Sequence, residues 1–287
     1  QDIRSVDAAK VRRTLQISRG DLHLLAGAPP CQGFSINAPI RSKGDERNHL
    51  FLEFLRFVDE FKPKAVLIEN VPGMVSLEKG ETVHAIISSL NEKGYDASVR
   101  ILFAAHYGVP QMRWRTIILA NRMGAPSLDM YPHPTHMAQG RANFTTSLDG
   151  VSLIFPQDIV EKVAAHEFVN VWEAISDLPE ISNGGGEEVA FYTDKPNSSF
   201  QEFCRGAETE LKNHVCARLG KINLERLQHI PLGGSWRDIP FDLLPKGMQR
   251  ARRSDHTKRY GRLDPKGLGS TILTKCDPHW GTFVHPF

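Results

Sequence analysis

A cysteine and a glutamate each follow an apolar segment at the point where that segment ends. Cys31 stands in the loop after the apolar run 22–26, and Glu69 comes directly after the apolar run 65–68. The carboxyl ends of parallel strands meet at one edge of an open α/β sheet, where ligands and reacting groups gather. We therefore expect the thiol and the carboxyl to lie side by side, as a nucleophile and an acid do in a reaction centre.

The neighbours of Cys31 favour a reactive thiol, although a lone cysteine is more often a small buried apolar residue. A cysteine attacks only as the thiolate, in a polar and partly exposed setting. Pro29 and Pro30 stiffen the loop before Cys31, and Gly33 lets a ligand approach the backbone after it. Glu69 has two interpretations: a solvated carboxylate at a strand end, or a buried acid with a raised pKa that donates a proton.

A third polar group alternates along the chain just before the apolar run 116–120. In an extended segment, this alternation turns Gln111, Arg113 and Arg115 to one side. Three long hydrogen-bond donors fit phosphate or carbonyl oxygens better than they fit a core. The alternative is a solvent-exposed edge strand.

These groups require a layered scaffold, and residues 1–121 have the pattern of one. Apolar residues recur at helical spacing in 51–58 and 83–90, which predicts two helices. Separate apolar runs before, between and after them predict strands at 22–26, 65–68, 97–103 and 116–120. Strands separated by such helices indicate a mostly parallel α/β sheet. From residue 122 onward, proline and glycine break the periodicity, which predicts a second, loop-rich domain suited to recognition.

Composition excludes several classes of protein. The 287 residues are 40% hydrophobic and 24% charged, and no run approaches the ~18 apolar residues of a membrane span. The four cysteines have no CxxC spacing, so we expect no disulfide framework and no zinc site, in a reducing cytoplasmic setting. Pro134 between His133 and His136 argues against a pair of helical metal ligands, and we expect no metal.

The chain resembles the DNA (cytosine-5)-methyltransferases in several blocks that occur in that family's order. Cys31 within Pro-Cys-Gln, Glu69-Asn70-Val71 and Gln111-x-Arg113-x-Arg115 are similar to its catalytic blocks. Residues 260–265 and 270–274 are similar to the block that follows target recognition, and Asp2-Ile3 to the end of a cofactor-site block. The resemblance covers essentially the whole chain, and most loosely residues 122–245.

The resemblance implies a partial class I methyltransferase-like (Rossmann-like) α/β sheet with a second, loop-rich target-recognition domain. We expect a partial catalytic domain at 1–121, the DNA-binding recognition domain at 122–258, and a return segment at 259–287. The family's glycine-rich cofactor loop is expected upstream of Asp2, and its closing segment beyond Phe287. We therefore expect an interior fragment or one half of a split enzyme, with a complementary polypeptide as a possible partner and weak activity in isolation.

The chemistry that the resemblance implies is methyl transfer from S-adenosylmethionine to C5 of a cytosine in double-stranded DNA. Cys31 would add to C6, while Glu69 would hold N3, Arg115 would hold O2, and Arg113 would anchor the loop or a phosphate. Because the target atoms are stacked inside a duplex, the base must be flipped out. The resemblance also implies a nucleoid-associated location in a bacterium and a restriction-modification setting.

Further residues have roles that the resemblance implies. Asp2, Ile3, Pro29 and Leu50 would bind the cofactor, and Asn70 would brace the cysteine loop. The predicted DNA contacts are Gln32, Ser35, Gln111, Arg250, Arg252, Arg253, Arg262 and Thr271. The arginines of 250–253, with Lys258, lie in a basic stretch suited to phosphates, although a solvated basic loop is an equal alternative.

Other interpretations compete with this enzyme. A catalytically silent DNA-binding fragment or partner subunit would have the same blocks, and an RNA cytosine methyltransferase would use the same chemistry. The long region between Arg115 and Tyr260 favours DNA, because it has room for a recognition domain. A structural α/β protein with an inert Cys31 is the remaining alternative.

Overall fold

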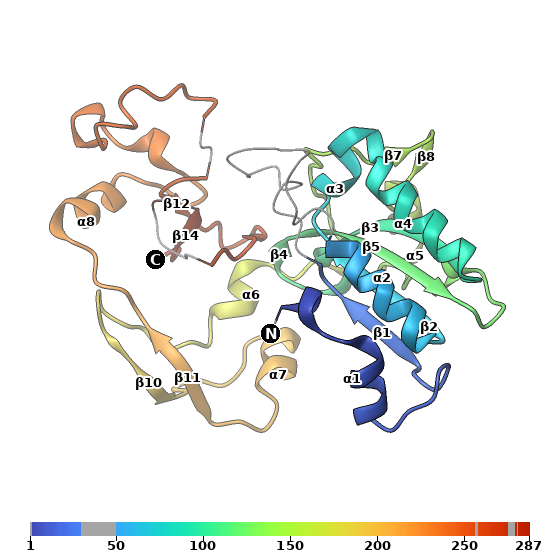
Figure 1. Ribbon diagram of the computed structural model, residues 1–287. Helices are drawn as coiled ribbons and strands as arrows, with labels where there is room; N and C mark the ends of the chain where they lie inside the picture. Colours follow the sequence, from blue (N-terminus) through green and yellow to red (C-terminus); the bar gives the residue numbers. More distant parts are fainter. Residues whose placement is uncertain (1, 30–49, 256–257, 275–278, 280) are drawn as a thin grey trace. The chain divides into compact units, whose positions relative to one another are not determined.

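The computed structural model describes residues 2–29, 50–255, 258–274, 279 and 281–287 (Figure 1). It divides into two compact units, residues 1–106 with 114–166 and residues 107–113 with 167–287. The first unit therefore extends well past residue 121, and a short piece of the predicted catalytic domain packs with the second unit. The functional roles expected of 1–121, 122–258 and 259–287 stay predictions.

The first unit is built on a four-stranded sheet with the order β1-β2-β5-β3. The strands are β1 (Leu24–Gly27), β2 (Ala65–Asn70), β3 (Asp96–Phe103) and β5 (Trp114–Asn121). All four coincide with predicted strands to within a few residues, and β1 pairs in parallel with β2 as expected. The mixed α/β class is confirmed.

Three of the four strands, β1, β2 and β3, run in the same direction, as a mostly parallel sheet requires, whereas β5 runs antiparallel to both of its neighbours, β2 and β3. A parallel crossover needs a dozen or more residues and usually a helix. Residues 104–113 contain only the 3-10 turn η4 (Ala104–Tyr107) and the two-residue strand β4 (Gln111–Met112), so β5 returns in the opposite direction.

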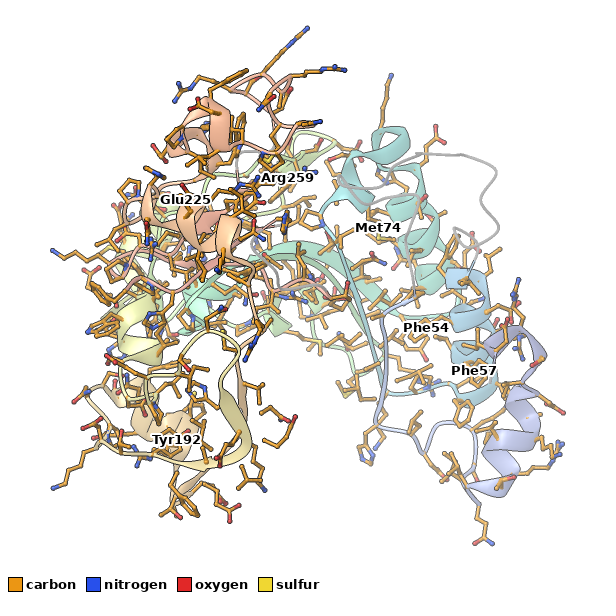
Figure 2. All side chains as sticks on the ribbon, turned by 90° about the vertical axis from the view of Figure 1, so that its left-hand side faces the viewer. Phe54, Phe57, Met74, Tyr192, Glu225 and Arg259 are labelled. Carbon is orange, nitrogen blue, oxygen red and sulfur yellow. The ribbon has the colours of Figure 1, made fainter. Side chains whose placement is uncertain are left out.

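Two amphipathic helices cover the sheet. Helix α2 (Leu50–Phe61) buries Phe54, Leu55, Val58 and Phe61, and α4 (Glu81–Glu92) buries Val83, Ile86 and Leu90. Apart from Phe61, these side chains form one core with Val66 and Ile68 of β2 and with Met74 of α3 (Gly73–Ser76); Phe54 and Met74 are labelled in Figure 2. Helix α1 (Ala8–Thr14) begins at Asp7, whose carboxylate accepts from the backbone amides of Ala9 and Lys10.

Short elements complete the first unit. They are η1 (Ile3–Ser5), η3 (Leu77–Gly80), η5 (Ser127–Met130), β6 (His136–Met137), the hairpin β7 (Ser147–Leu148) with β8 (Val151–Ser152), and α5 (Gln157–Val163). Strand β9 (His166–Glu167) spans the change from the first unit to the second.

The second unit consists of short elements joined by loops, as the sequence predicts. Its helices are α6 (Val171–Ile175), α7 (Ser199–Arg205) and α8 (Lys221–Gln228), with the turns η6 (Trp236–Asp238) and η7 (Phe241–Leu243). Its strand pairs are β10 (Gly186–Phe191) with β11 (Glu210–Val215), β12 (Gly261–Arg262) with β14 (Thr282–Val284), and β4 with β13 (Gly269–Ser270). A small core gathers Ile230, Trp236, Ile239, Met248 and Tyr260.

No helix of the described residues has the length and apolar character that crossing a bilayer requires.

Candidate active site

The adjacent ends of β1 and β2 form the first part of the site. Their parallel register places Gly27 beside Ile68, so the residues that follow each strand emerge at the same edge. The Asn70 side-chain amide donates to the Pro29 carbonyl over 3.1 Å, and its oxygen accepts from the Val71 amide over 2.8 Å. Asn70 therefore fixes the chain just before the predicted cysteine loop. Cys31, Gln32 and Ser35 lie outside the described residues, so the meeting of thiol and carboxyl stays a prediction.

Glu69 and Arg115 form an ion pair at this edge. Arg115 Nε donates to Glu69 Oε1 over 2.7 Å, and Arg115 Nη1 donates to the Trp114 carbonyl over 2.8 Å. The register of β2 and β5 pairs Glu69 with Ile117, which puts Arg115 two residues farther along the same face. The two side chains are 35% and 23% exposed, so the pair is open enough to meet a ligand yet partly shielded from water.

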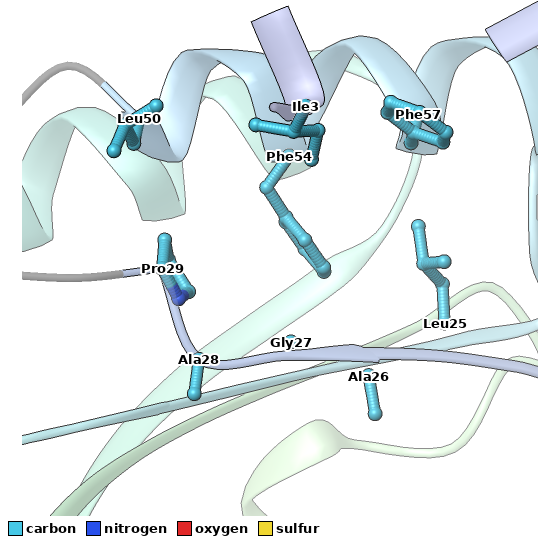
Figure 3. A pocket seen from close by; sticks show the side chains of 9 residues that line it. All are labelled: Ile3, Leu25, Ala26, Gly27, Ala28, Pro29, Leu50, Phe54 and Phe57. Carbon is cyan, nitrogen blue, oxygen red and sulfur yellow. The ribbon is translucent and has the colours of Figure 1, made fainter. Parts of the chain in front are cut away.

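An apolar pocket of about 330 Å³ lies beside the same strand ends, between η1, β1 and α2 (Figure 3). Its lining includes Ile3, Pro29 and Leu50, three of the four residues predicted to bind the cofactor. The remaining lining residues are Leu25, Ala26, Gly27, Ala28, Phe54 and Phe57. Flat apolar walls of this kind suit an aromatic ring system, so the residues present fit the adenosine part of S-adenosylmethionine.

Asp2, the fourth predicted cofactor residue, precedes the pocket residue Ile3. Its carboxylate accepts from the guanidinium and the backbone amide of Arg4, with Arg4 Nη2 2.6 Å from Asp2 Oδ2. The Arg4 hydrogen bonds lower the pKa of Asp2 to about 2, so the group is an ionised acceptor at neutral pH. It is solvent-exposed, which leaves it accessible to a donor such as an adenine amino group.

The block 111–113 meets the block 269–271 within the second unit. Strand β4 pairs in parallel with β13, with Gln111 opposite Gly269, and the Thr271 hydroxyl donates to the Met112 carbonyl over 2.7 Å. The single extended segment expected over 111–115 is wrong. The Arg113 amide turns back to the Gln111 carbonyl, so the chain bends between β4 and β5, and Arg115 belongs to β5 in the first unit.

The predicted phosphate contacts divide into two kinds. Arg250, Arg252, Arg253 and Lys258 are exposed, as a phosphate contact requires. Arg262 is a correction. Its guanidinium donates to the carbonyls of Leu227, Ile230 and His285 over 2.7, 2.8 and 2.9 Å, so its donors hold the backbone of the second unit together. We therefore assign Arg262 a structural role.

Sequence reasoning missed the two aromatic residues of α2 that line the pocket. Phe54 and Phe57 follow Leu50 at spacings of four and seven residues, which places all three on the face of α2 that meets β1. The Phe54 ring points at Gly27, where a Cβ would lie 2.5 Å from it (Figure 3). The helical stripe was visible in the sequence, but nothing in the sequence showed which strand it faces.

Among the described residues, no cluster of three or more His, Cys, Asp or Glu side chains has the geometry to hold a metal ion.

Comparison with known proteins gives a consistent result. Residues 1–203 match the model of the C-5 cytosine-specific DNA methylase family. The chain is 36% identical over 228 residues to the DNA (cytosine-5)-methyltransferase PliMCI of Paracentrotus lividus, which covers 77% of the chain and 14% of that protein. It is 35% identical over 227 residues to the type II methyltransferase M.AgeI of Thalassovita gelatinovora, which covers 78% of the chain and 51% of that protein.

The fold has a counterpart among solved structures. A prophage-encoded E. coli protein with a proposed role as a DNA modification methyltransferase aligns over 99% of this chain and 71% of its own, with a TM-score of 0.61. Its sequence identity to the chain is 20%, so this likeness concerns the fold. The chain spans about half the length of M.AgeI and a much smaller part of PliMCI.

Proposed function

This chain belongs to the C-5 cytosine-specific DNA methylase family, and from that premise we propose that it transfers a methyl group to C5 of a flipped-out cytosine in duplex DNA. The observation that carries the proposal is the Glu69–Arg115 pair at the edge where β1 and β2 end. N3 and O2 are adjacent atoms on one edge of cytosine. A carboxyl and a guanidinium held 2.7 Å apart match that edge, with one group for each atom.

In the proposed mechanism, the Cys31 thiolate forms a bond to C6 and the C5–C6 π electrons move toward N3 and O2. Glu69 carries a proton to N3, and Arg115 donates to O2, so both stabilise the charge that develops. Bound S-adenosylmethionine would supply the electrophilic methyl group for C5, with the electron pair of the broken sulfur–methyl bond staying on the cofactor's sulfur. A base then removes the C5 proton, and the electron pair of that bond restores the C5–C6 double bond as the Cys31 thiolate leaves. The N3 proton returns to Glu69 in the same step. Arg113 anchors the neighbouring loop or a phosphate.

The apolar pocket supports the proposed cofactor site. Ile3, Pro29 and Leu50 would pack against the adenosine part, with the ionised Asp2 as acceptor for its amino group. Asn70 would hold the strand end next to the pocket through its bond to Pro29. This arrangement would place the methyl donor beside the same strand edge as the Glu69–Arg115 pair.

We assign the proposed contacts with double-stranded DNA to two groups of residues. Gln32 and Ser35 would fill the space that the flipped base leaves, and Gln111 and Thr271 would approach the backbone. Arg250, Arg252, Arg253 and Lys258 would bind phosphates, because they are exposed cations in one stretch of the chain. These contacts position the protein, and sequence reading would fall to other side chains of the recognition region.

The proposal is tested by methyl transfer and by covalent trapping. The full-length protein that contains this chain, with any complementary polypeptide supplied, is incubated with labelled cofactor and duplex DNA, single-stranded DNA or tRNA. We expect transfer to duplex DNA, and a stable adduct with an oligonucleotide that contains 5-fluorocytosine. Cys31→Ser should abolish the adduct and leave DNA binding in place.

Other results would point to the alternatives. A preference for tRNA would favour the RNA methyltransferase. DNA binding by a folded, complemented protein without transfer or adduct would favour the silent DNA-binding subunit.

A further inference from the structure

Two groups of the described residues hold the Arg115 guanidinium before any substrate binds. The Glu69 carboxylate accepts from Nε over 2.7 Å, and the Trp114 backbone carbonyl accepts from Nη1 over 2.8 Å. The direction of the guanidinium therefore depends on where the Trp114 peptide lies. Trp114 is the first residue of β5, and the first residue of a strand is held by fewer ladder bonds than the residues inside it.

The Trp114 ring is fixed by an aromatic cluster on the opposite face of the strand. It stacks on Phe103 with the centroids 4.2 Å apart and an interplanar angle of 13°. Phe144 and His106 meet it edge-on at 5.5 and 6.4 Å. Both rings pack closely against Gly140, because a Cβ at that position would lie 2.7 Å from Phe103 and 2.9 Å from Trp114.

Strand alternation separates this cluster from the site. Trp114 packs against the core with Thr116 and Ile118 on its face, whereas Arg115 and Glu69 lie on the other face. The indole therefore cannot touch a cytosine bound to Arg115. Any effect of the ring on the reaction passes through the Trp114 backbone.

The environment of the indole N–H shows which property of the Trp114 ring stabilises the cluster. Within the described residues, Trp114 Nε1 is buried and meets no acceptor. A buried donor without a partner lowers the free energy of unfolding by about 1–3 kcal/mol. The indole N–H therefore does not stabilise the cluster. The flat shape of the ring does, and phenylalanine should replace it well.

We propose that Trp114 is a positioning residue for the methyl transfer described above: its stacked ring holds the start of β5 so that its carbonyl, together with Glu69, aims Arg115 at the cytosine. This inference rests on the proposed function. It adds a residue whose side chain lies on the far side of the sheet from the reacting base.

The test compares Trp114→Phe, Trp114→Leu and Trp114→Ala in the full-length protein. Tyr131→Phe is the matched control, because the buried Tyr131 hydroxyl donates to the Ile117 carbonyl and accepts from the Leu119 amide of the same strand. The control weakens β5 without touching the start of the strand. The first readout is the Arg115 Nε–H signal in NMR, which Arg115→Lys identifies by removing it.

We expect Trp114→Ala and Trp114→Leu to lower kcat by about 10- to 100-fold, the size expected of a small misplacement of a reacting group. KM should change by less than about threefold, because the change affects the transition state more than binding. The Nε–H signal should shift and exchange faster with water in both variants. Trp114→Phe and Tyr131→Phe should keep the wild-type signal and kcat, even where Tyr131→Phe lowers the melting temperature. Trp114→Leu covers the case in which the alanine variant does not fold.

Two outcomes would overturn the inference. One is a wild-type Nε–H signal and kcat in Trp114→Leu. The other is an equal loss of kcat in Tyr131→Phe, which would mean that any weakening of the strand has the same effect. Failure of the proposed function looks different, because the wild-type protein itself would then transfer no methyl group while the Nε–H signal still reports on Trp114.

Discussion

The two units hold their functional side chains by different means. In the first unit, the strand register positions the side chains. The pairing of β1, β2 and β5 brings Glu69, Arg115 and the pocket to one edge of the sheet. In the second unit, side chains hold the backbone, and the Arg262 guanidinium joins the C-terminal end of α8 to the segment that follows β14. Substitutions in the first unit can therefore remove chemistry and spare the fold, whereas comparable substitutions in the second can remove the fold itself.

The largest expected effect is on the reaction. Glu69→Gln should keep the contact with Arg115 but lose the transferable proton, and we expect kcat to fall by about 10²- to 10⁴-fold. The free energy of unfolding should change little, because a partly exposed ion pair contributes about 0–1 kcal/mol. Methyl transfer and urea unfolding measure the two effects.

Glu60→Gln is the matched control for Glu69→Gln. Glu60 lies on α2 and accepts from Arg12 and Arg19 over 2.7 and 2.8 Å, away from the strand ends. This variant should lower stability and leave kcat unchanged. Equal losses of activity in the two variants would contradict the assignment of the chemistry to the strand edge.

The next effect concerns the stability of the second unit. Arg262→Ala removes hydrogen bonds from a charged donor to three carbonyls in two segments, the end of α8 and the segment after β14, and we expect the free energy of unfolding to fall by about 2–4 kcal/mol. Arg252→Ala, at an exposed arginine of the same unit, should change it by less than about 0.5 kcal/mol. Urea unfolding of both variants checks this. If Arg262→Ala is fully stable and loses only DNA affinity, the original assignment of Arg262 to DNA is restored.

The alkaline stability of the first unit should depend on Tyr131. Burial raises the pKa of Tyr131 to about 12, whereas an unfolded tyrosine loses its proton near its ordinary value of 10. Between these values the unfolded state binds fewer protons, so the free energy of unfolding falls as pH rises, by at most about 1.4 kcal/mol per pH unit.

Unfolding curves of the wild type and Tyr131→Phe at several pH values between 9 and 12 measure this dependence. The stability advantage of the wild type should shrink as the pH rises. An advantage that stays constant over this range would show that the hydroxyl does not titrate as described.

The smallest effect concerns the basic stretch of the second unit. Arg252→Ala and Arg253→Ala should each weaken DNA binding by a similar factor for all sequences and reduce the salt slope of log K by about 1. Binding titrations at several salt concentrations measure both quantities. A loss confined to one DNA sequence would mean that these arginines read bases.

Periodicity predicted the first unit well, because its helices and strands are long enough to show it. The limits of β2, α2 and α4 follow from runs such as 65–68 and 51–58. The reversal of β5 was missed, because alternation along a strand is the same in both directions. Only the short connection 104–113 carries that information.

The candidate site shows the same limit at the level of side chains. Glu69 and Asn70 were placed correctly at a strand end, since both follow directly from the position of β2. Arg262 was expected to contact DNA because the resemblance implied that role for its block. Its partners lie at the end of α8 (Leu227 and Ile230) and after β14 (His285), and these segments meet Arg262 only through tertiary packing, which no local pattern encodes.

The contact between Phe54 and Gly27 has a practical consequence for enzyme engineering. The ring occupies the space that any side chain at position 27 would need, so these two residues together set the depth of the pocket. If the pocket holds the methyl donor as proposed, a smaller residue at position 54 would make room for a bulkier analogue of that donor.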